Sequence, residues 1–207
     1  MAVVQSVSTW KLPYHFLTFN HPGGVAPGDT SFILQRLAEQ STGAAVLGAL
    51  EDPGAKQICL EVDVGARLTL RVGGNTGEAA DQPFDLTVRV RAAVRENSQD
   101  MLSIRGASGP AVWVETDFAL HVLLMSMRSQ VFSPHAFTGL GLGLGPGDKR
   151  LIMVQGMQHL YAAFAPLASE VLYVSALGAL GFNFAHLPCR VRDTNYWPSR
   201  LEPHGLG

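Results

Sequence analysis

The residues of this chain best suited to bind a ligand lie in and around one loop, residues 20–30. Three glycines and two prolines in eleven residues exclude a regular helix or strand there, because glycine allows positive φ whereas proline fixes φ and lacks a donor. We expect backbone N–H groups to gather at the start of the following helix, near Asp29 and Thr30, where anionic groups commonly bind. Alternatively, Asp29 or Thr30 only caps this helix, and the glycines only permit a sharp turn.

Two further positions lie outside this loop. Asn75 belongs to a second glycine-rich turn, residues 73–77, and His159 lies near the start of a later predicted helix. The candidates for lining a substrate cleft are Asn20, His21, Gly23, Gly24, Asp29, Thr30, Asn75 and His159. For Gly24 we also predict a positive φ, which side-chain-bearing residues rarely adopt.

A nucleotide site is excluded by charge and spacing. Gly23 and Gly28 match the glycines of a phosphate-binding G-x-x-x-x-G-K-[ST] loop, but Asp29 stands where the lysine should be. Residues 139–147 alternate glycine with other residues, yet no G-x-G-x-x-G fits them, and the apolar strand follows this stretch instead of preceding it.

A catalytic centre is not recognisable in the sequence. A hydrolytic zinc site needs three converging His or carboxylate ligands and an open position, and the seven histidines show no such spacing. Cys59 and Cys189 form no C-x-x-C pair, and Cys59 lies in an apolar run typical of a buried free thiol. We therefore predict no catalytic residue, no metal ligand and no cofactor within this chain.

The elements that position the candidates follow from hydrophobic periodicity. Residues 16–19 form an apolar run before the loop, residues 32–40 have the period of an amphipathic helix, and residues 44–50 are continuously apolar, as in a strand covered on both faces. These three segments predict a parallel strand-helix-strand unit. Asp52 and Pro53 are then the typical N-cap and first residue of a short helix.

The middle and the end of the chain differ in period. Apolar and polar residues alternate over 68–72 and 84–91, which predicts half-buried antiparallel strands, and further strands are expected at 111–115 and 118–126. Near the end, a strand at 151–154, a helix at 158–169 and a strand at 171–174 are expected. The predicted fold is α/β, with a mixed sheet that has parallel strand-helix-strand units at both ends and an antiparallel meander in the middle. Because loops at the carboxyl ends of parallel strands share one edge, the 20–30 loop, the 73–77 turn and the segment at His159 should converge on one crevice.

Composition limits the partners. The net charge of −2, with scattered basic residues, gives no attraction for nucleic acid or an anionic membrane. No apolar run approaches the roughly 20 residues that span a bilayer, and the N-terminus lacks a signal-peptide core, so a cytoplasmic location is expected. We predict a poorly ordered segment at residues 1–15 and one domain over residues 16–203. With only 15% charged residues, part of its surface should be covered by another domain or subunit.

Short strings in a fixed order connect the chain with a known family. The loop resembles the Asp-Asn-Pro-Gly-Gly-Gly-Ala-Pro-Gly-Asp-Thr signature that opens the C-terminal domain of the MlrC-like (microcystinase C) metallopeptidases. The resemblance continues in the same order along the chain, in Glu51-Asp52-Pro53, Val72-Gly73-Gly74-Asn75-Thr76-Gly77, Arg128 with Phe132-Ser133-Pro134, His159 with Ala162-Ala163-Phe164-Ala165-Pro166, and Trp197-Pro198.

This resemblance implies a substrate-cleft-forming domain of a zinc hydrolase that acts on peptide-like amide bonds. It also implies that zinc belongs to an N-terminal metallopeptidase domain or subunit, which would lie before Met1 and would be the main partner. A small peptide-like substrate and a second copy of this chain are further candidate partners.

The chain departs from the family pattern at positions where chemistry would be sensitive. Asn20 and His21 replace Asp-Asn, Val25 replaces a glycine, and Asn75 and Gln155 each replace a lysine. These changes favour an alternative function, a non-catalytic binding or interaction domain from a degenerate or split gene.

Overall fold

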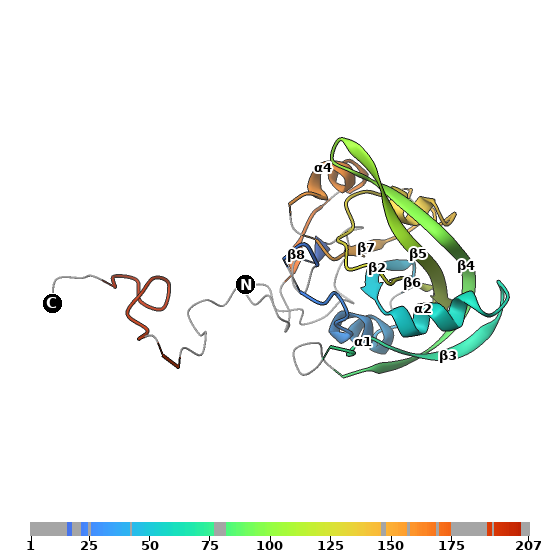
Figure 1. The fold of residues 1–207 in the computed structure, drawn as a ribbon, viewed down its shortest axis with the longest axis horizontal. Coiled ribbons are helices and arrows are strands. Elements are labelled where there is room, and N and C mark those ends of the chain that lie inside the picture. Colours follow the sequence, from blue (N-terminus) through green and yellow to red (C-terminus); the bar gives the residue numbers. More distant parts are fainter. Residues whose placement is uncertain are drawn as a thin grey trace.

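A computed structural model describes residues 16–17, 22–24, 26–41, 43–76, 82–145, 148–156, 158–168, 170–174, 190–191 and 193–203 of this chain. The predicted N-terminal segment, residues 1–15, lies outside these residues, as do the candidates Asn20 and His21. Figure 1 shows how the described elements are arranged.

The centre of the fold is a six-stranded sheet in the order β3-β4-β5-β6-β2-β7. Strand β2 runs parallel to both of its neighbours, β6 and β7, whereas β3, β4, β5 and β6 follow one another antiparallel. The strands are β2 (Ala45–Glu51), β3 (Arg67–Val72), β4 (Phe84–Met101), β5 (Ile104–Thr116), β6 (Leu120–Met125) and β7 (Leu151–Val154). The predicted α/β fold with a mixed sheet is confirmed.

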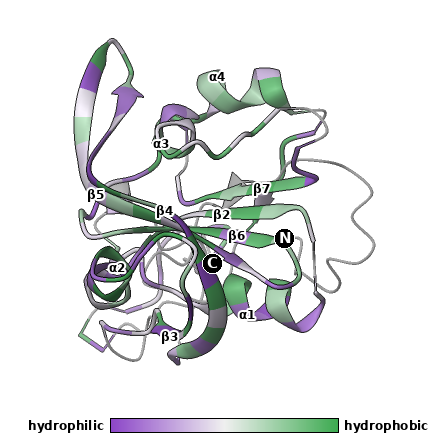
Figure 2. Ribbon diagram, turned by 90° about the vertical axis from the view of Figure 1, so that its right-hand side faces the viewer, coloured by the Kyte–Doolittle hydropathy of each residue, from purple (hydrophilic) through white to green (hydrophobic). Residues whose placement is uncertain are grey.

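Helices cover both faces of the sheet (Figure 2). Helices α1 (Phe32–Glu39) and α2 (Pro53–Leu60) lie on one face, and the short helices α3 (His135–Thr138) and α4 (Tyr161–Phe164) lie on the other.

Two apolar clusters form because strand β2 is buried on both sides. Its Leu47 enters the cluster beneath α1 and α2, while the adjacent Val46 enters the cluster beneath α3 and α4. Cys59 is a buried free thiol in the first cluster, as predicted. Among the described residues, no helix combines the length and the apolar character needed to cross a bilayer.

The two ends of the chain pair differently from the predicted units. Strand β1 (Phe16–Leu17) does not join β2 but pairs in parallel with β8 (Tyr173–Val174) in a separate two-stranded sheet. The helix predicted for residues 158–169 is shorter: α4 is followed by a single 3-10 turn, Ala165–Leu167. Pro166 accounts for the change, because proline lacks the N–H that a continuing helix needs.

The hairpin of β4 and β5 is longer than the sequence pattern suggested (Figure 1). Its far half is held by hydrogen bonds to α3 and to the segment before α3. Asn97 Nδ2 donates to the carbonyl oxygen of Ala136 at 2.9 Å, and the backbone N–H of Asp100 donates to Ser133 Oγ at 3.0 Å. Alternation of apolar residues could not reveal this half, because hydrogen bonds rather than apolar contacts fix it.

Candidate functional site

The carboxylate of Asp29 joins the first glycine-rich loop to the turn that follows β3. Its Oδ2 accepts hydrogen bonds from the backbone N–H groups of Asn75 and Thr76, each at 2.9 Å, and from Thr76 Oγ1 at 2.8 Å. The backbone N–H of Gly74 also donates to the carbonyl oxygen of Asp29 at 2.9 Å. The structure thus brings together two of the candidates, Asp29 and Asn75, although 46 residues separate them.

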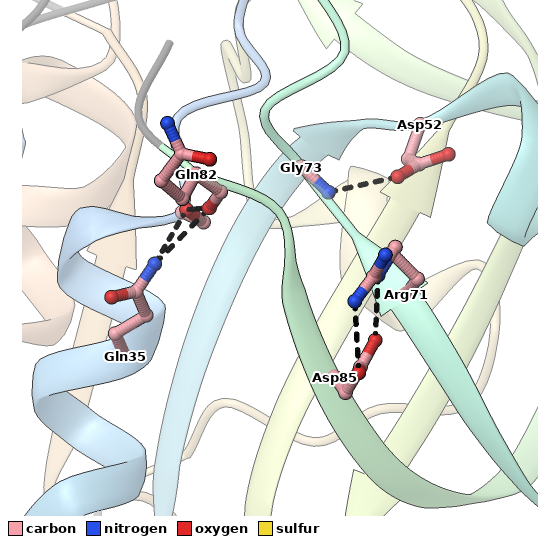
Figure 3. A network of polar contacts seen from close by, with 7 residues as sticks. Gln35, Asp52, Arg71, Gly73, Gln82 and Asp85 are labelled. Carbon is pink, nitrogen blue, oxygen red and sulfur yellow. Dashed lines mark hydrogen bonds and ion pairs between the residues drawn. The ribbon is translucent and has the colours of Figure 1, made fainter.

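Asp52 fixes the same turn from the other side. Its Oδ1 accepts from the backbone N–H of Ala55 at 2.9 Å, which confirms the predicted N-cap of α2. Its Oδ2 accepts from the backbone N–H of Gly73 at 2.9 Å, shown in Figure 3, and from Asn75 Nδ2 at 3.1 Å. Asp29, Asp52 and residues 73–76 are called the loop-turn junction below.

The glycine at position 73 is required by this geometry. Its φ is +69°, and a Cβ atom there would lie 2.7 Å from the carbonyl oxygen of Asp29. A side chain would therefore both strain the backbone and separate the loop from the turn.

The N-terminus of α1 is organised differently from the prediction. Its N-cap is Ser31, and no side chain caps the helix, so the alternative assignment of a cap to Asp29 or Thr30 is wrong. The carboxylate of Asp29 already serves the 73–76 turn. Ser31 Oγ instead donates to the carbonyl oxygen of Gln82 at 2.5 Å, and Gln35 Nε2 reaches the same oxygen at 3.2 Å (Figure 3).

The positive φ predicted for Gly24 occurs four residues later. Gly24 ends a single right-handed 3-10 turn, Pro22–Gly24, whereas Gly28 has φ +86°. A Cβ atom on Gly28 would lie 2.8 Å from Pro22 Cγ and 3.4 Å from Gln155 Oε1. The carbonyl oxygen of Gly28 accepts from the backbone N–H of Glu51 at 2.9 Å, which ties the loop to the end of β2.

Arg128, whose ion pair with Glu51 sequence reasoning missed, supports the second half of the loop. One Nη of Arg128 donates to the carbonyl oxygen of Ala26 at 2.9 Å, and its Nε lies 3.6 Å from Glu51 Oε2. Burial raises the pKa of Glu51; the carboxylates of Asp29 and Asp52 raise it further, while Arg128 opposes them. The sequence did carry a signal for this pair, because Glu51 and Arg128 have opposite charges and each follows a predicted strand.

His159 lies just before α4 and is exposed. Its Nδ1 is 3.0 Å from Gln130 Nε2, and its ring stacks on Phe132 with centroids 5.9 Å apart. Its contacts among the described residues are with Gln130 and Phe132 and not with the loop-turn junction. It does lie beyond the carboxyl end of β7, and this strand runs parallel to β2, whose own carboxyl end carries Glu51 and Asp52.

Three segments were predicted to converge, and the structure shows direct contact between two of them, the glycine-rich loop and the turn after β3. The 26–30 part of the loop touches the 73–76 turn, and the residue after β7, Gln155, is adjacent to Gly28. Thr30 is buried beside Asp29, and Gly23 is described only by its place in the 3-10 turn. That these residues line a substrate cleft stays a prediction.

Two departures from the family pattern can be interpreted in the structure. Asn75, in place of a lysine, still presents a side-chain donor to Asp52. Gln155, also in place of a lysine, is a neutral side chain that is only 2% exposed. At both positions an amide side chain, which can still form hydrogen bonds, replaces the charged ammonium group of lysine.

No group of three or more His, Cys, Asp or Glu side chains suited to a metal ion is found among the described residues. The two carboxylates of the loop-turn junction are engaged by N–H and O–H donors, which is the pattern of carboxylates that hold a backbone in place. The described residues therefore do not fit a zinc centre, and we assign no chemical step to a metal held by them.

The fold and this site define an α/β domain in which two polar loops meet beside the carboxyl end of strand β2. The chain belongs to the MlrC C-terminus family, whose model matches residues 20–190. It is 28% identical over 179 residues to microcystinase C of Sphingomonas sp., an alignment that covers 86% of this chain and 34% of that protein.

A solved structure supports the same fold. A candidate metallopeptidase from Mesorhizobium sp. BNC1 aligns with 83% of this chain and 35% of its own, with a TM-score of 0.72 and 22% sequence identity. The chain thus spans about a third of the length of both proteins that it resembles.

Proposed function

We propose that this chain is the C-terminal, substrate-cleft-forming domain of an MlrC-like metallopeptidase that hydrolyses peptide-like amide bonds. The zinc ion would be carried by an N-terminal metallopeptidase domain or subunit, where it would polarise the scissile carbonyl and activate water. The described residues of this chain would supply the shape and the hydrogen bonds of one cleft wall.

The observation that carries the proposal is the loop-turn junction. Two buried carboxylates, Asp29 and Asp52, hold residues 73–76 against the 26–30 loop through backbone hydrogen bonds. The junction lies beside the carboxyl end of β2, which runs parallel to β6 and β7, and the carboxyl ends of parallel strands are where α/β sheets commonly place ligands. Membership of the MlrC C-terminus family supports the same assignment.

The expected setting follows from this function. The main partner would be the metal-bearing domain, the substrate a small peptide-like molecule and the location the cytoplasm. A second copy of this chain is a further candidate partner, because eleven large apolar side chains among the described residues remain exposed.

A second candidate function is a non-catalytic binding or interaction domain. The observation that favours it is the composition of the junction, whose carboxylates are occupied by structural hydrogen bonds. In this case the chain would bind a partner protein without contributing to hydrolysis.

The experiment joins this chain to the metal-binding domain of an MlrC-like protein and measures cleavage of an internally quenched short peptide. The metal-binding domain alone and this chain alone are the controls. Zinc is measured in each by inductively coupled plasma mass spectrometry. Zinc-dependent cleavage by the joined protein, with no stoichiometric zinc in this chain alone, supports the first function. Stable association without any gain in cleavage supports the second.

A further inference from the structure

The imidazole of His159 is exposed, but its position is fixed on several sides. The residue that follows it, Leu160, is fully buried, which holds the local backbone against the apolar cluster beneath α4. The ring itself stacks on Phe132 with an interplanar angle of 28°. An exposed histidine held in this way loses little rotamer entropy when it binds a ligand.

The backbone of the segment that contacts His159 is held by strand β4. Gln99 is fully buried in β4; its Nε2 donates to the carbonyl oxygen of Gln130 at 3.0 Å, and its Oε1 accepts from the backbone N–H of Phe132 at 2.7 Å. The supporting segment, residues 130–132, is therefore bonded to the sheet at both of its ends, at Gln130 and at Phe132, whose ring stacks on His159.

The contact between Gln130 and His159 determines which ring nitrogen carries the proton. The amide nitrogen Nε2 of Gln130 faces the ring nitrogen Nδ1 of His159 at 3.0 Å. An amide nitrogen can only donate, so Nδ1 accepts, and in the neutral ring the proton must be on Nε2. His159 then offers one N–H donor at the far side of the ring.

We infer that His159 contacts the substrate of the proposed cleft by donating its Nε2–H to a backbone carbonyl oxygen of a peptide-like molecule. This inference rests on the proposed function, because it places the substrate at the carboxyl edge of the sheet. A pre-positioned N–H donor suits a carbonyl acceptor, since it needs no reorganisation when the peptide binds. Gln99 and Gln130 are positioning residues, which act through the orientation and tautomer of the ring.

The first test reads the tautomer without any assay of activity. Long-range ¹H–¹⁵N correlation spectra of this chain, recorded at mildly alkaline pH, should show the Nε2–H form of His159, assigned by its loss in His159→Gln. Replacing Gln130 with glutamate should convert the signal to a form protonated on Nδ1, because a carboxylate can only accept. The Nδ1–H form in the unmodified chain would overturn the inference.

The second test measures kcat/KM for short-peptide cleavage by this chain joined to a metal-binding domain. Glutamine can place its amide N–H near the position of the imidazole Nε2, whereas asparagine reaches only as far as Nδ1. We therefore expect His159→Asn to lose about tenfold, the size of effect expected when one hydrogen bond to the substrate is removed. His159→Gln should keep most of the activity, and Gln158→Ala, an exposed neighbour, is the matched control.

The two tests separate failure of the inference from failure of the proposed function. If the joined protein cleaves peptide and His159→Asn is as active as the control, the inference is overturned and the proposed function stands. If the joined protein cleaves no peptide, the proposed function fails. The inference is then decided by titrating this chain with an N-acetyl dipeptide amide, which should shift the Nε2–H signal of His159; an unchanged signal overturns it.

Discussion

Replacing Asp52 with alanine should destabilise the domain by about 2–4 kcal/mol. The structure divides this cost into two parts. Loss of the N-cap bond to Ala55 costs about 1 kcal/mol. The buried N–H of Gly73, left without an acceptor, costs a further ~1–3 kcal/mol. For a chain of this size each kcal/mol lowers Tm by about 2–4 °C. The assay is urea unfolding followed by far-UV circular dichroism, with Tm as a check.

A serine at position 52 separates the two parts. Its hydroxyl can accept from Ala55 but is too short to serve Gly73 as well, so Asp52→Ser should recover only about 1 kcal/mol relative to Asp52→Ala. Asn75→Ala, which removes a bond made by an exposed side chain, is the control and should cost less than about 1 kcal/mol. Full stability of Asp52→Ser would show that the bond to Gly73 contributes nothing and would refute the description of the junction.

Three further predictions concern single positions. Gly28→Ala should cost more than about 1 kcal/mol because of φ +86° and the contact with Pro22, whereas Gly24→Ala, in a right-handed turn, should cost much less; equal melting midpoints would contradict this. Gly48→Ala should cost about 1–3 kcal/mol or more, because the new Cβ would lie 2.3 Å from the buried ring of Phe137, and adding Phe137→Leu should restore part of the loss in urea unfolding. Burial raises the pKa of the Glu51 carboxyl group above its ordinary value of 4.5. The folded state therefore binds the carboxyl proton more tightly than the unfolded chain does, and stability falls as pH rises through the raised pKa. Glu51→Gln should therefore lose less stability than the unmodified chain between about pH 4 and pH 7, and identical pH profiles in urea unfolding would exclude this role.

Elements with strong local signals could be predicted from the sequence. Strand β2 is recognisable because residues 44–50 are continuously apolar, and α2 because aspartate precedes proline at its start. The partner of β1 could not be predicted, since a two-residue strand carries no pattern that distinguishes β8 from β2. The far half of the β4–β5 hairpin was missed for a related reason, because buried side chains such as Gln99 stabilise it through hydrogen bonds.

The sequence indicated two polar residues that meet in the fold, Asp29 and Asn75, but it did not indicate how they make contact. Asp29 and Asn75 were selected because polar residues beside glycines mark loops that can approach a ligand. That the Asp29 carboxylate accepts from the 73–76 turn, instead of capping α1, depends on the position of β3 beside the loop. Likewise, Gln130 lies in a segment without periodic pattern, so only the folded chain shows that it contacts His159. The opposite charges of Glu51 and Arg128 indicate a pair only once β2, which ends at Glu51, and β6, which precedes Arg128, are known to be neighbours.

The measurement that tests the central claim most directly is kcat/KM for a short peptide, compared between a metal-binding domain alone and the same domain joined to this chain. We expect the joined protein to be more active, and Asp29→Ala, which removes three hydrogen bonds at the loop-turn junction, to raise KM. Equal activity with and without this chain would contradict its role as a wall of the substrate cleft.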